Sequence, residues 1–290
     1  MTRRREVVSR LHGLAEVREI INAMKTLSFI ETRRIGARLE NEQGVIESIE
    51  AAAADFLAAH PDLDTGAADM PVLWIAIGSE RGFCGDFNER VAERLRADIV
   101  AQGGGAPPVL LVGTRLASRL EGDPRVVAAL PGAGVADEVD GTLARIVQTL
   151  GSERRQRGPV RVRAVFYDHA GGAPRAVSLL PPFRDLPKAR HDGRMPPRIH
   201  LAPDALLLAL ADQYLSAALR RLLDTASMAE HQRRVEHLEG ALRHLDDRVA
   251  ALDRRRNQLR QEEIIEEIEV ILLSAGSGGE WTPAGSADST

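Results

Sequence analysis

The feature that most constrains this chain is a stretch from Pro203 to Ala275 with the pattern of one continuous helix. Apolar residues recur in it at alternating steps of three and four, which is the heptad pattern of a coiled coil. The seam consists of Val235, Leu238, Leu242, Leu245, Val249, Leu252 and Leu259, with Arg256 at the single position that is not apolar. At about 1.5 Å per residue, this helix would be on the order of 100 Å long. Because it cannot bury its apolar stripe against itself, it needs a partner helix.

The first segment of the chain, residues 1–60, is the predicted partner. Its apolar side chains also follow one helical stripe, and the opposite face is rich in Arg and Glu. His60-Pro61 closes the pattern, because a residue before proline avoids the helical region. The predicted stripe comprises Val7, Leu11, Leu14, Val17, Ile20 or Ile21, Met24, Leu27, Ile30 or Ile35, and Leu39. We therefore expect a long antiparallel coiled coil of N- and C-terminal helices, with the middle of the chain inserted as a separate lobe.

The middle of the chain alternates short apolar runs with amphipathic segments, which predicts a Rossmann-like α/β domain with a parallel or mostly parallel sheet. Strands are predicted at 72–77, 109–112, 125–130, 160–167 and 176–180, and helices at 88–100, 114–120 and 135–150. The predicted organisation is an N-terminal coiled-coil helix (1–60), an α/β domain with a Pro- and Arg-rich linker (61–200), a C-terminal coiled-coil helix (201–275) and a disordered polar tail (276–290).

Composition argues against several classes of protein. The net charge of -4 does not favour a general nucleic-acid binder, which would need clustered positive charge. Cys84 is the single cysteine, so no intramolecular disulfide or cysteine metal cluster can form. No run approaches the roughly 18 to 20 apolar residues of a membrane span, and the first residues lack the pattern of a secretory signal.

The turn from Gly78 to Gly85 follows a predicted strand and precedes a helix, where nucleotide-binding loops occur. It lacks both the Lys-Ser/Thr of a phosphate loop and the full dinucleotide glycine pattern. We interpret its glycines as residues that allow a tight turn and close helix packing. Cys84 could be a nucleophile at a helix start, but a small buried residue is the favoured interpretation.

Histidines on the long C-terminal helix do not have the spacing of a metal site. His231, His237 and His244 are six or seven residues apart, whereas a chelating pair on a helix is four apart. We predict that they are solvated residues on the flank of the helix. The sequence therefore predicts no catalytic residue, no cofactor and no metal site.

Three separated motifs resemble those of the γ subunit of F-type ATP synthases. The first is Ile20-x-x-Ala23-Met24, similar to the family's Ile-Thr-Lys-Ala-Met. The second is Arg81-Gly82-Phe-Cys84-Gly85-Asp-Phe-Asn88, similar to Arg-Gly-Leu-Cys-Gly-x-x-Asn. The third is Asn257-x-x-Arg260-Gln261-x-x-Ile264-x-x-Glu267, preceded by Glu230-His231 and Arg234. The resemblance extends from Thr2 to Ala275.

This resemblance implies a central rotor stalk that couples ion translocation through a membrane c-ring to ATP synthesis or hydrolysis in a hexamer of α and β subunits. The implied partners are the α, β and ε subunits and the c-ring. The implied location is the cytoplasmic side of a bacterial plasma membrane, with peripheral attachment. The chain itself would be non-catalytic. The coupling ion, proton or sodium, stays open, and departures from the usual family pattern raise the divergent N-type paralogue as an option.

The resemblance also implies roles for individual residues. Arg260 and Gln261 would form a polar catch with a loop of a β subunit. The rotor–stator contact would also include Asn257, Ile264 and Glu267, and the apolar end from Ile268 to Leu273 would lie in a hydrophobic sleeve. Ala23 and Met24 would form the contact of the N-terminal helix.

Two other functions are compatible with the pattern. A free-standing adaptor with an α/β head would pair its heptads between two copies and form a homodimer. An α/β enzyme would bind a nucleotide at the Gly82 turn.

Overall fold

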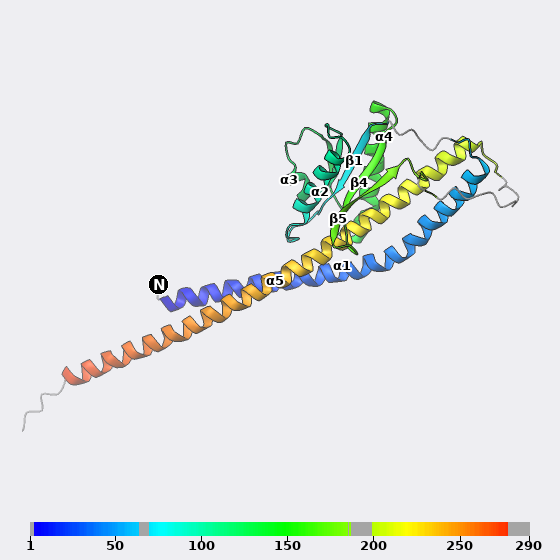
Figure 1. The fold of residues 1–290 in the computed structure, drawn as a ribbon. Coiled ribbons are helices and arrows are strands. Elements are labelled where there is room, and N and C mark those ends of the chain that lie inside the picture. Colours follow the sequence, from blue (N-terminus) through cyan, green and yellow to red (C-terminus); the bar gives the residue numbers. More distant parts are fainter. Residues whose placement is uncertain (1–2, 64–69, 185, 187–198, 278–290) are drawn as a thin grey trace, which may run out of the picture. The chain divides into compact units, whose positions relative to one another are not determined.

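The computed structural model describes residues 3–63, 70–184, 186 and 199–277. Most of the predicted linker and tail (187–198 and 278–290) lies outside these residues. The elements in chain order are α1 (Arg3–Ala59), β1 (Val72–Ile77), α2 (Phe87–Ala101), β2 (Val109–Val112), α3 (Thr114–Arg119), β3 (Val126–Leu130), the 3-10 turn η1 (Ala136–Glu138), α4 (Val139–Arg157), β4 (Arg161–Asp168), β5 (Ala173–Leu180) and α5 (Pro203–Ser277) (Figure 1). The predicted combination of two long terminal helices and an α/β sheet is confirmed.

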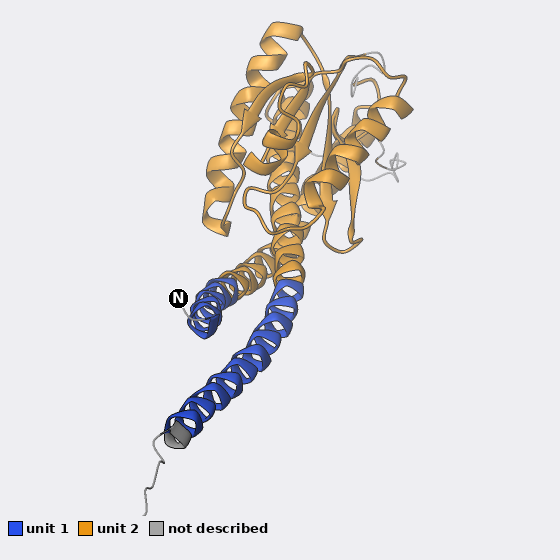
Figure 2. Cartoon of the chain, turned by 90° about the vertical axis from the view of Figure 1, so that its left-hand side faces the viewer, with its two compact units in different colours: residues 1–23, 239–290 blue, residues 24–238 orange. Residues whose placement is uncertain are grey.

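The chain divides into two compact units (Figure 2). Unit 1 comprises residues 1–23 and 239–290, and unit 2 comprises residues 24–238. Both long helices contribute to both units, because α1 and α5 each continue across the division. Among the described residues, no helix is both long and apolar enough to cross a membrane.

Unit 2 contains a five-stranded sheet with the order β3-β2-β1-β4-β5. The first four of these strands run parallel, and β5 pairs antiparallel with β4 at the edge. In the register of the sheet, Trp74 of β1 lies between Val109 of β2 and Arg163 of β4. The prediction of a mostly parallel sheet is therefore confirmed. The central position of β1 explains its continuous apolar run, since both of its faces are covered.

Side chains of β1 alternate between two apolar cores on opposite faces of the sheet. Leu73, Ile75 and Ile77 belong to the core that α4 and α5 cover, whereas Trp74 and Ala76 belong to the core with α2 and α3. The alternation follows from the two-residue period of a strand. Unit 2 is therefore a three-layer α/β fold in which α5 is one of the covering helices.

The extent of α4 differs from the prediction. The helix begins at Val139, after the turn η1, and continues to Arg157 rather than ending near Leu150. Its last turn contains three arginines, which interact favourably with the negative end of the helix dipole. Gly158, with a φ of 81°, ends the helix. The prediction ended too early because it followed the apolar residues alone.

In unit 1, the first part of α1 runs antiparallel to the last part of α5. Arg18 Nε lies 3.0 Å from Asp246 Oδ1, and Arg4 Nε lies 3.2 Å from Glu263 Oε2. From Arg18 back to Arg4 along α1, the partner residue moves forward along α5, from Asp246 to Glu263, as in an antiparallel pair. The buried seam residues are Leu242, Leu245 and Leu259, together with Leu238 in unit 2. The predicted heptad seam and its antiparallel partner are confirmed.

The predicted stripe on α1 is only partly correct. Ile35 is fully buried, but Val17, Leu27 and Ile30 are each more than 40% exposed. The buried positions near the start of unit 2 are instead Ser28 and Glu31. A straight helix rotates by about 20° per heptad relative to a strict heptad repeat. A single stripe along 57 residues therefore cannot stay in contact with the same partner.

Candidate functional site

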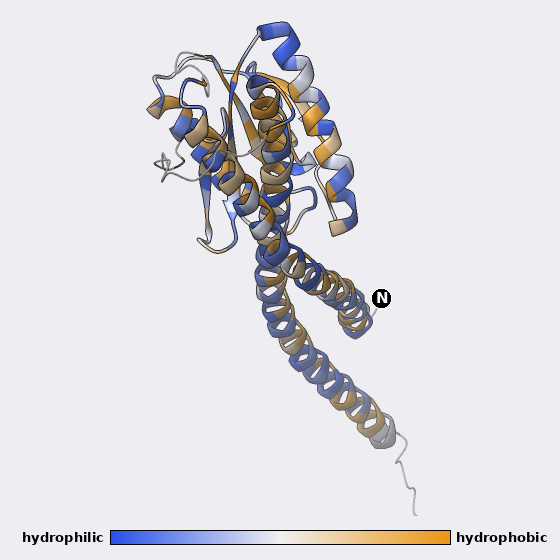
Figure 3. Ribbon diagram, turned by 90° about the vertical axis from the view of Figure 1, so that its right-hand side faces the viewer, coloured by the Kyte–Doolittle hydropathy of each residue, from blue (hydrophilic) through white to orange (hydrophobic). Residues whose placement is uncertain are grey.

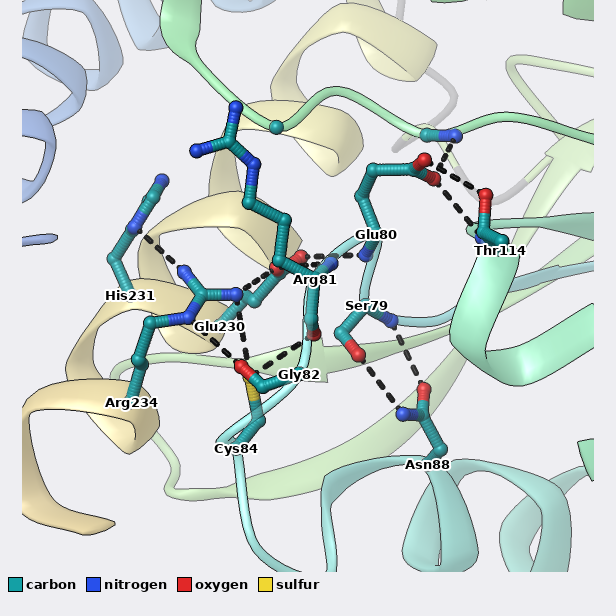
Figure 4. A network of polar contacts seen from close by, with 12 residues as sticks. Ser79, Glu80, Arg81, Gly82, Cys84, Asn88, Thr114, Glu230, His231 and Arg234 are labelled. Carbon is teal, nitrogen blue, oxygen red and sulfur yellow. Dashed lines mark hydrogen bonds and ion pairs between the residues drawn. The ribbon is translucent and has the colours of Figure 1, made fainter. Parts of the chain in front are cut away.

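The turn between β1 and α2, residues 78–86, is bound by buried polar side chains of α5 (Figure 4). The carboxylate of Glu230 accepts hydrogen bonds from the backbone N–H groups of Glu80 and Arg81, each at 3.1 Å. Arg234, one helical turn later, forms an ion pair with Glu230 and donates from Nε to the carbonyl of Gly82 at 3.0 Å. Both α5 side chains are buried. We refer to Glu230 and Arg234 as the clamp.

Two further contacts hold the start of the turn. Asn88 accepts a hydrogen bond from the backbone N–H of Ser79 at 2.9 Å and donates to its Oγ at 2.8 Å. The Glu80 carboxylate accepts from the backbone N–H groups of Thr114 and Gly132 at 2.9 and 2.7 Å. Burial opposes the charge of Glu80, but the hydrogen bonds from Thr114 and Gly132 lower its pKa below the ordinary value. The turn is thus attached to α2, which follows it, and to the connections after β2 and β3.

Two glycines of this turn are required by geometry. Gly85 has a φ of 62°, which other residues rarely adopt. A Cβ at Gly78 would lie 2.3 Å from the Cβ of Leu116 on α3. At Gly82, by contrast, a Cβ would meet nothing closer than the Arg115 guanidinium at 3.7 Å. The predicted tight turn and close packing therefore apply to Gly85 and Gly78, whereas Gly82 contributes its carbonyl to the clamp.

Cys84 is a buried thiol. Its burial, with a smaller contribution from the charge of Glu230, raises its pKa to about 12, although Arg234 opposes this shift. The thiolate is the nucleophilic form of cysteine, so a thiol with this pKa is unreactive at neutral pH. The interpretation of Cys84 as a small buried residue is confirmed.

We expect Cys84 of the folded chain to resist alkylation by iodoacetamide at pH 8 and to react rapidly once the chain is unfolded in urea. Burial and the raised pKa both oppose the reaction. Mass spectrometry of the intact chain after timed quenching measures the modified fraction. Equally fast labelling with and without urea would contradict the buried thiol.

The prediction of a solvated His231 is wrong. The side chain is 3% exposed, and Arg234 Nη1 lies 3.0 Å from its Nδ1. Burial, followed by the charges of Arg234 and Arg81, lowers its pKa to about 4, so the ring is neutral at pH 7. His237 and His244 are exposed, as predicted. His231 differs because α5 lies inside the lobe at this point. Among the described residues, no cluster of three or more His, Cys, Asp or Glu could hold a metal ion.

The clamp also bears on the nucleotide-binding alternative. In phosphate loops, backbone N–H groups between a strand and a helix bind the anionic phosphate. Here the N–H groups of Glu80 and Arg81 donate to Glu230, a carboxylate of the same chain. A phosphate would have to displace this buried carboxylate and separate it from Arg234. The geometry therefore favours a structural turn over a nucleotide site.

The second set of predicted site residues lies on α5 in unit 1. Asn257, Arg260, Gln261 and Glu267 are exposed, and Ile264 is 45% exposed. Their spacing of three or four residues places them along one side of the helix. The α1-facing side is different, because it contains the buried Leu259 and the Arg4 partner Glu263. The predicted rotor–stator residues thus form one exposed stripe, which we refer to as the polar stripe.

The end of α5 exposes an unusual amount of apolar surface. Figure 3 shows hydrophobic residues recurring along α5 up to its last described turns. The exposed apolar residues here are Ile264, Ile265, Ile268, Val270, Ile271, Leu272 and Leu273, which are between 45% and 75% exposed. Contiguous apolar surface of this kind is typical of an interaction site. On α1, Ala23 is exposed and Met24 is half-buried.

Comparison with known proteins identifies the family of this chain. Residues 3–277 match the family model described as ATP synthase. The ATP synthase gamma chain of Mycoplasmoides gallisepticum is 24% identical over 291 residues, which cover 95% of this chain and 99% of that protein. This chain belongs to the ATP synthase gamma chain family. It is accordingly a gamma subunit, the central stalk of a rotary ATP synthase, and is a non-catalytic subunit of that enzyme.

Solved structures show the same fold. A chain in the Euglena gracilis mitochondrial ATP synthase structure (OSCP/F1/c-ring) matches with a TM-score of 0.64 and 16% identity, over 99% of both chains. A chain in the central stalk/c-ring structure of the Tetrahymena thermophila mitochondrial ATP synthase matches with a TM-score of 0.57 and 16% identity, over 77% of this chain and 99% of that one. The arrangement of long helices and α/β sheet therefore also occurs in chains of these two ATP synthase structures.

Sequence reasoning missed the role of the clamp in this gamma subunit. Glu230, His231 and Arg234 were recognised only as part of a family motif. A signal was present, because Glu230 and Arg234 are four residues apart and the apolar seam begins immediately after them. A charged pair at this spacing is usually a solvated surface pair. The turn that buries this one is about 150 residues away in the sequence.

Proposed function

We propose that this gamma subunit transmits torque between a membrane c-ring and the nucleotide-binding hexamer of α and β subunits, at the cytoplasmic side of a bacterial plasma membrane. The observation that carries the proposal is the exposed apolar end of α5, from Ile264 to Leu273. An end with this much apolar surface needs a surrounding partner surface. The family implies that this partner is the hydrophobic sleeve of the hexamer, which would serve as a bearing.

The polar stripe is the proposed point of contact with the moving parts of the hexamer. Arg260 and Gln261 present a charge and an amide on the exposed side of α5. A guanidinium can form paired hydrogen bonds with a carboxylate, so it suits a specific catch with a β-subunit loop. Asn257 and Glu267 extend the stripe in both directions, and Ile264 supplies an apolar contact between them. Ala23 and Met24 are the proposed contact residues of α1.

In this proposal, rotation of the stalk is coupled to nucleotide binding in the hexamer because the stalk is asymmetric. A rotating chain can change nucleotide affinity at a β subunit only if it interacts differently with that subunit's alternative conformations. A polar stripe on one side of a helix meets each β subunit in turn as the stalk rotates. The contact at each angle would therefore favour one nucleotide affinity over another.

Inside unit 2, α5 is held by two kinds of contact that would let it transmit torque. Its apolar residues, including Leu219 and Leu223, lie in the sheet core, and the clamp attaches it to the turn after β1. We propose that the lobe faces the ε subunit and the c-ring, so that load on α5 passes to the ring through these contacts. The relatives are bacterial gamma chains, and the Euglena structure contains F1 and a c-ring. The coupling ion, proton or sodium, and the choice between the main F-type and the N-type paralogue stay open.

Co-expression with the α and β subunits of the same organism tests this function. We expect the tagged chain to purify with α and β in constant stoichiometry, because the end of α5 would be buried in their sleeve. Replacing Ile268→Asp and Leu272→Asp should reduce recovery of α and β several-fold, since charges would enter an apolar contact. The matched control is Glu266→Gln with Glu269→Gln, which changes exposed polar residues of the same turns. It should leave recovery unchanged.

The same preparation discriminates the alternatives. An adaptor would elute as a stable homodimer without α or β, and an enzyme at the Gly82 turn would bind nucleotide when isolated. Either result, together with unchanged recovery in the Ile268→Asp and Leu272→Asp variant, would contradict the proposed function.

A further inference from the structure

Unit 2 contains two carboxyl groups that face each other between its long helices. Glu42 lies on α1 and Asp224 on α5, and their side chains are within hydrogen-bonding reach. Asp224 is fully buried, and Glu42 is half-buried. Both oxygens of Asp224 and Oε2 of Glu42 are buried and receive no hydrogen bond from any residue that the structure describes. Three buried acceptor atoms without a donor would be costly if both groups were ionised.

A proton between the two groups supplies the missing donor. When two carboxyl groups share a buried site, mutual repulsion keeps one of them protonated, and the neutral group can donate to the other. We propose that Glu42 and Asp224 share one proton and so form a pH-sensitive latch between α1 and α5. The latch shares no residue with the clamp or with the polar stripe, and it does not depend on the proposed torque transmission.

The charged groups around the pair are consistent with a proton rather than a metal ion. Arg38 of α1 donates to the carbonyl of Ala136 at 2.7 Å, and Arg220 of α5 forms an ion pair with Asp140 of α4. The positive charges of Arg38 and Arg220 lower the pKa of both carboxyl groups, but neither guanidinium donates a hydrogen bond to the unpaired oxygens of Glu42 and Asp224. The negative charge of Asp140 raises the pKa of Asp224. Two nearby positive charges oppose the binding of a cation, and among the described residues no group of three or more His, Cys, Asp or Glu is arranged to hold a metal ion.

Burial sets the pH range of the latch. It raises the pKa of Glu42 to about 8, with Asp224 adding to the shift, and it also raises the pKa of Asp224. A cavity of about 290 Å³, lined by side chains that include Val45 and Leu143, adjoins Glu42. The pKa of Glu42 is higher in the folded chain than its ordinary value of 4.5, so protonated Glu42 stabilises the folded state. This contribution to the free energy of unfolding is fully present below pH 4.5. It is lost as the pH rises through about 8.

Thermal unfolding of the full chain as a function of pH tests the latch. The melting temperature of the wild type should fall between about pH 5 and pH 9 by roughly 5 °C more than that of Glu42→Gln. A glutamine amide donates to Asp224 at every pH, so this variant keeps the contact. Glu40→Gln is the matched control, since Glu40 is an exposed carboxyl on the same helix. It should retain the pH dependence of the wild type.

Infrared spectroscopy of the folded wild type gives a test that needs no variant. The carbonyl stretch of a protonated carboxylic acid should be present at pH 6 and disappear with a midpoint near pH 8. The same band should be missing in Glu42→Gln or, if that variant does not fold, should disappear at a lower pH in Asp224→Asn, because Asp224 adds to the shift. Identical pH dependence of melting in wild type and Glu42→Gln, or absence of the band at pH 6, would overturn the proposal. A divalent cation that raises the melting temperature of the wild type but not of Glu42→Gln would overturn it in favour of a metal site.

Discussion

Replacing Arg234 with alanine is expected to lower the free energy of unfolding by about 3–5 kcal/mol, the loss typical of breaking one side of a buried ion pair. The variant leaves the Glu230 carboxylate buried without its guanidinium partner, and burial already raises the pKa of Glu230. It also removes the hydrogen bond to the carbonyl of Gly82. Urea unfolding followed by circular dichroism measures the change.

The neighbouring arginine provides the control. Arg233 is half-buried and forms ion pairs with two exposed carboxylates, Asp86 at 3.3 Å and Glu236 at 3.2 Å. Exposed pairs contribute little, so Arg233→Ala should cost about 1 kcal/mol or less. The double variant Glu230→Gln with Arg234→Met should lose less free energy of unfolding than Arg234→Ala, because it leaves no unpaired buried charge. Equal losses for Arg234→Ala and Arg233→Ala would show that the clamp does not hold the turn.

Replacing Arg260→Ala together with Gln261→Ala is expected to leave the fold intact and to reduce coupled ATP synthesis on the order of tenfold. Both side chains are exposed on α5, so their removal leaves no buried group unpaired. In the proposed complex they contact a β-subunit loop, and truncating a central arginine of an interface commonly costs about 2 kcal/mol. ATP synthesis by membrane vesicles at a fixed ion gradient measures the effect, with circular dichroism of the isolated chain as the check on folding.

A matched double variant separates the polar stripe from the rest of the helix. Gln258→Ala with Glu262→Ala also removes two exposed polar side chains, but from another side of α5. Its activity should remain close to that of the wild type. Full coupling in the Arg260→Ala and Gln261→Ala variant, or the same loss in both double variants, would count against the catch.

The sequence by itself determined the elements whose signal is local. The heptad seam of α5 predicted its length and an antiparallel partner, because apolar periodicity reports directly on one buried side of a helix. The run from Val72 to Ile77 predicted a buried strand, and β1 has these bounds. Three separated motifs, including the Gly82 turn, were enough to indicate the gamma family before any fold was known.

Only the tertiary structure decided which polar residues of these elements are buried and paired. His231 and Glu230 have the sequence context of solvated helix residues, yet the turn after β1 covers them. Glu42 and Asp224 are 182 positions apart and meet only because α1 and α5 pack within unit 2. The pKa of a side chain and its hydrogen-bond partners depend on groups brought close by folding. Local periodicity does not identify those groups: the spacing of Glu230 and Arg234 shows that they can pair, but not that the turn after β1 buries them.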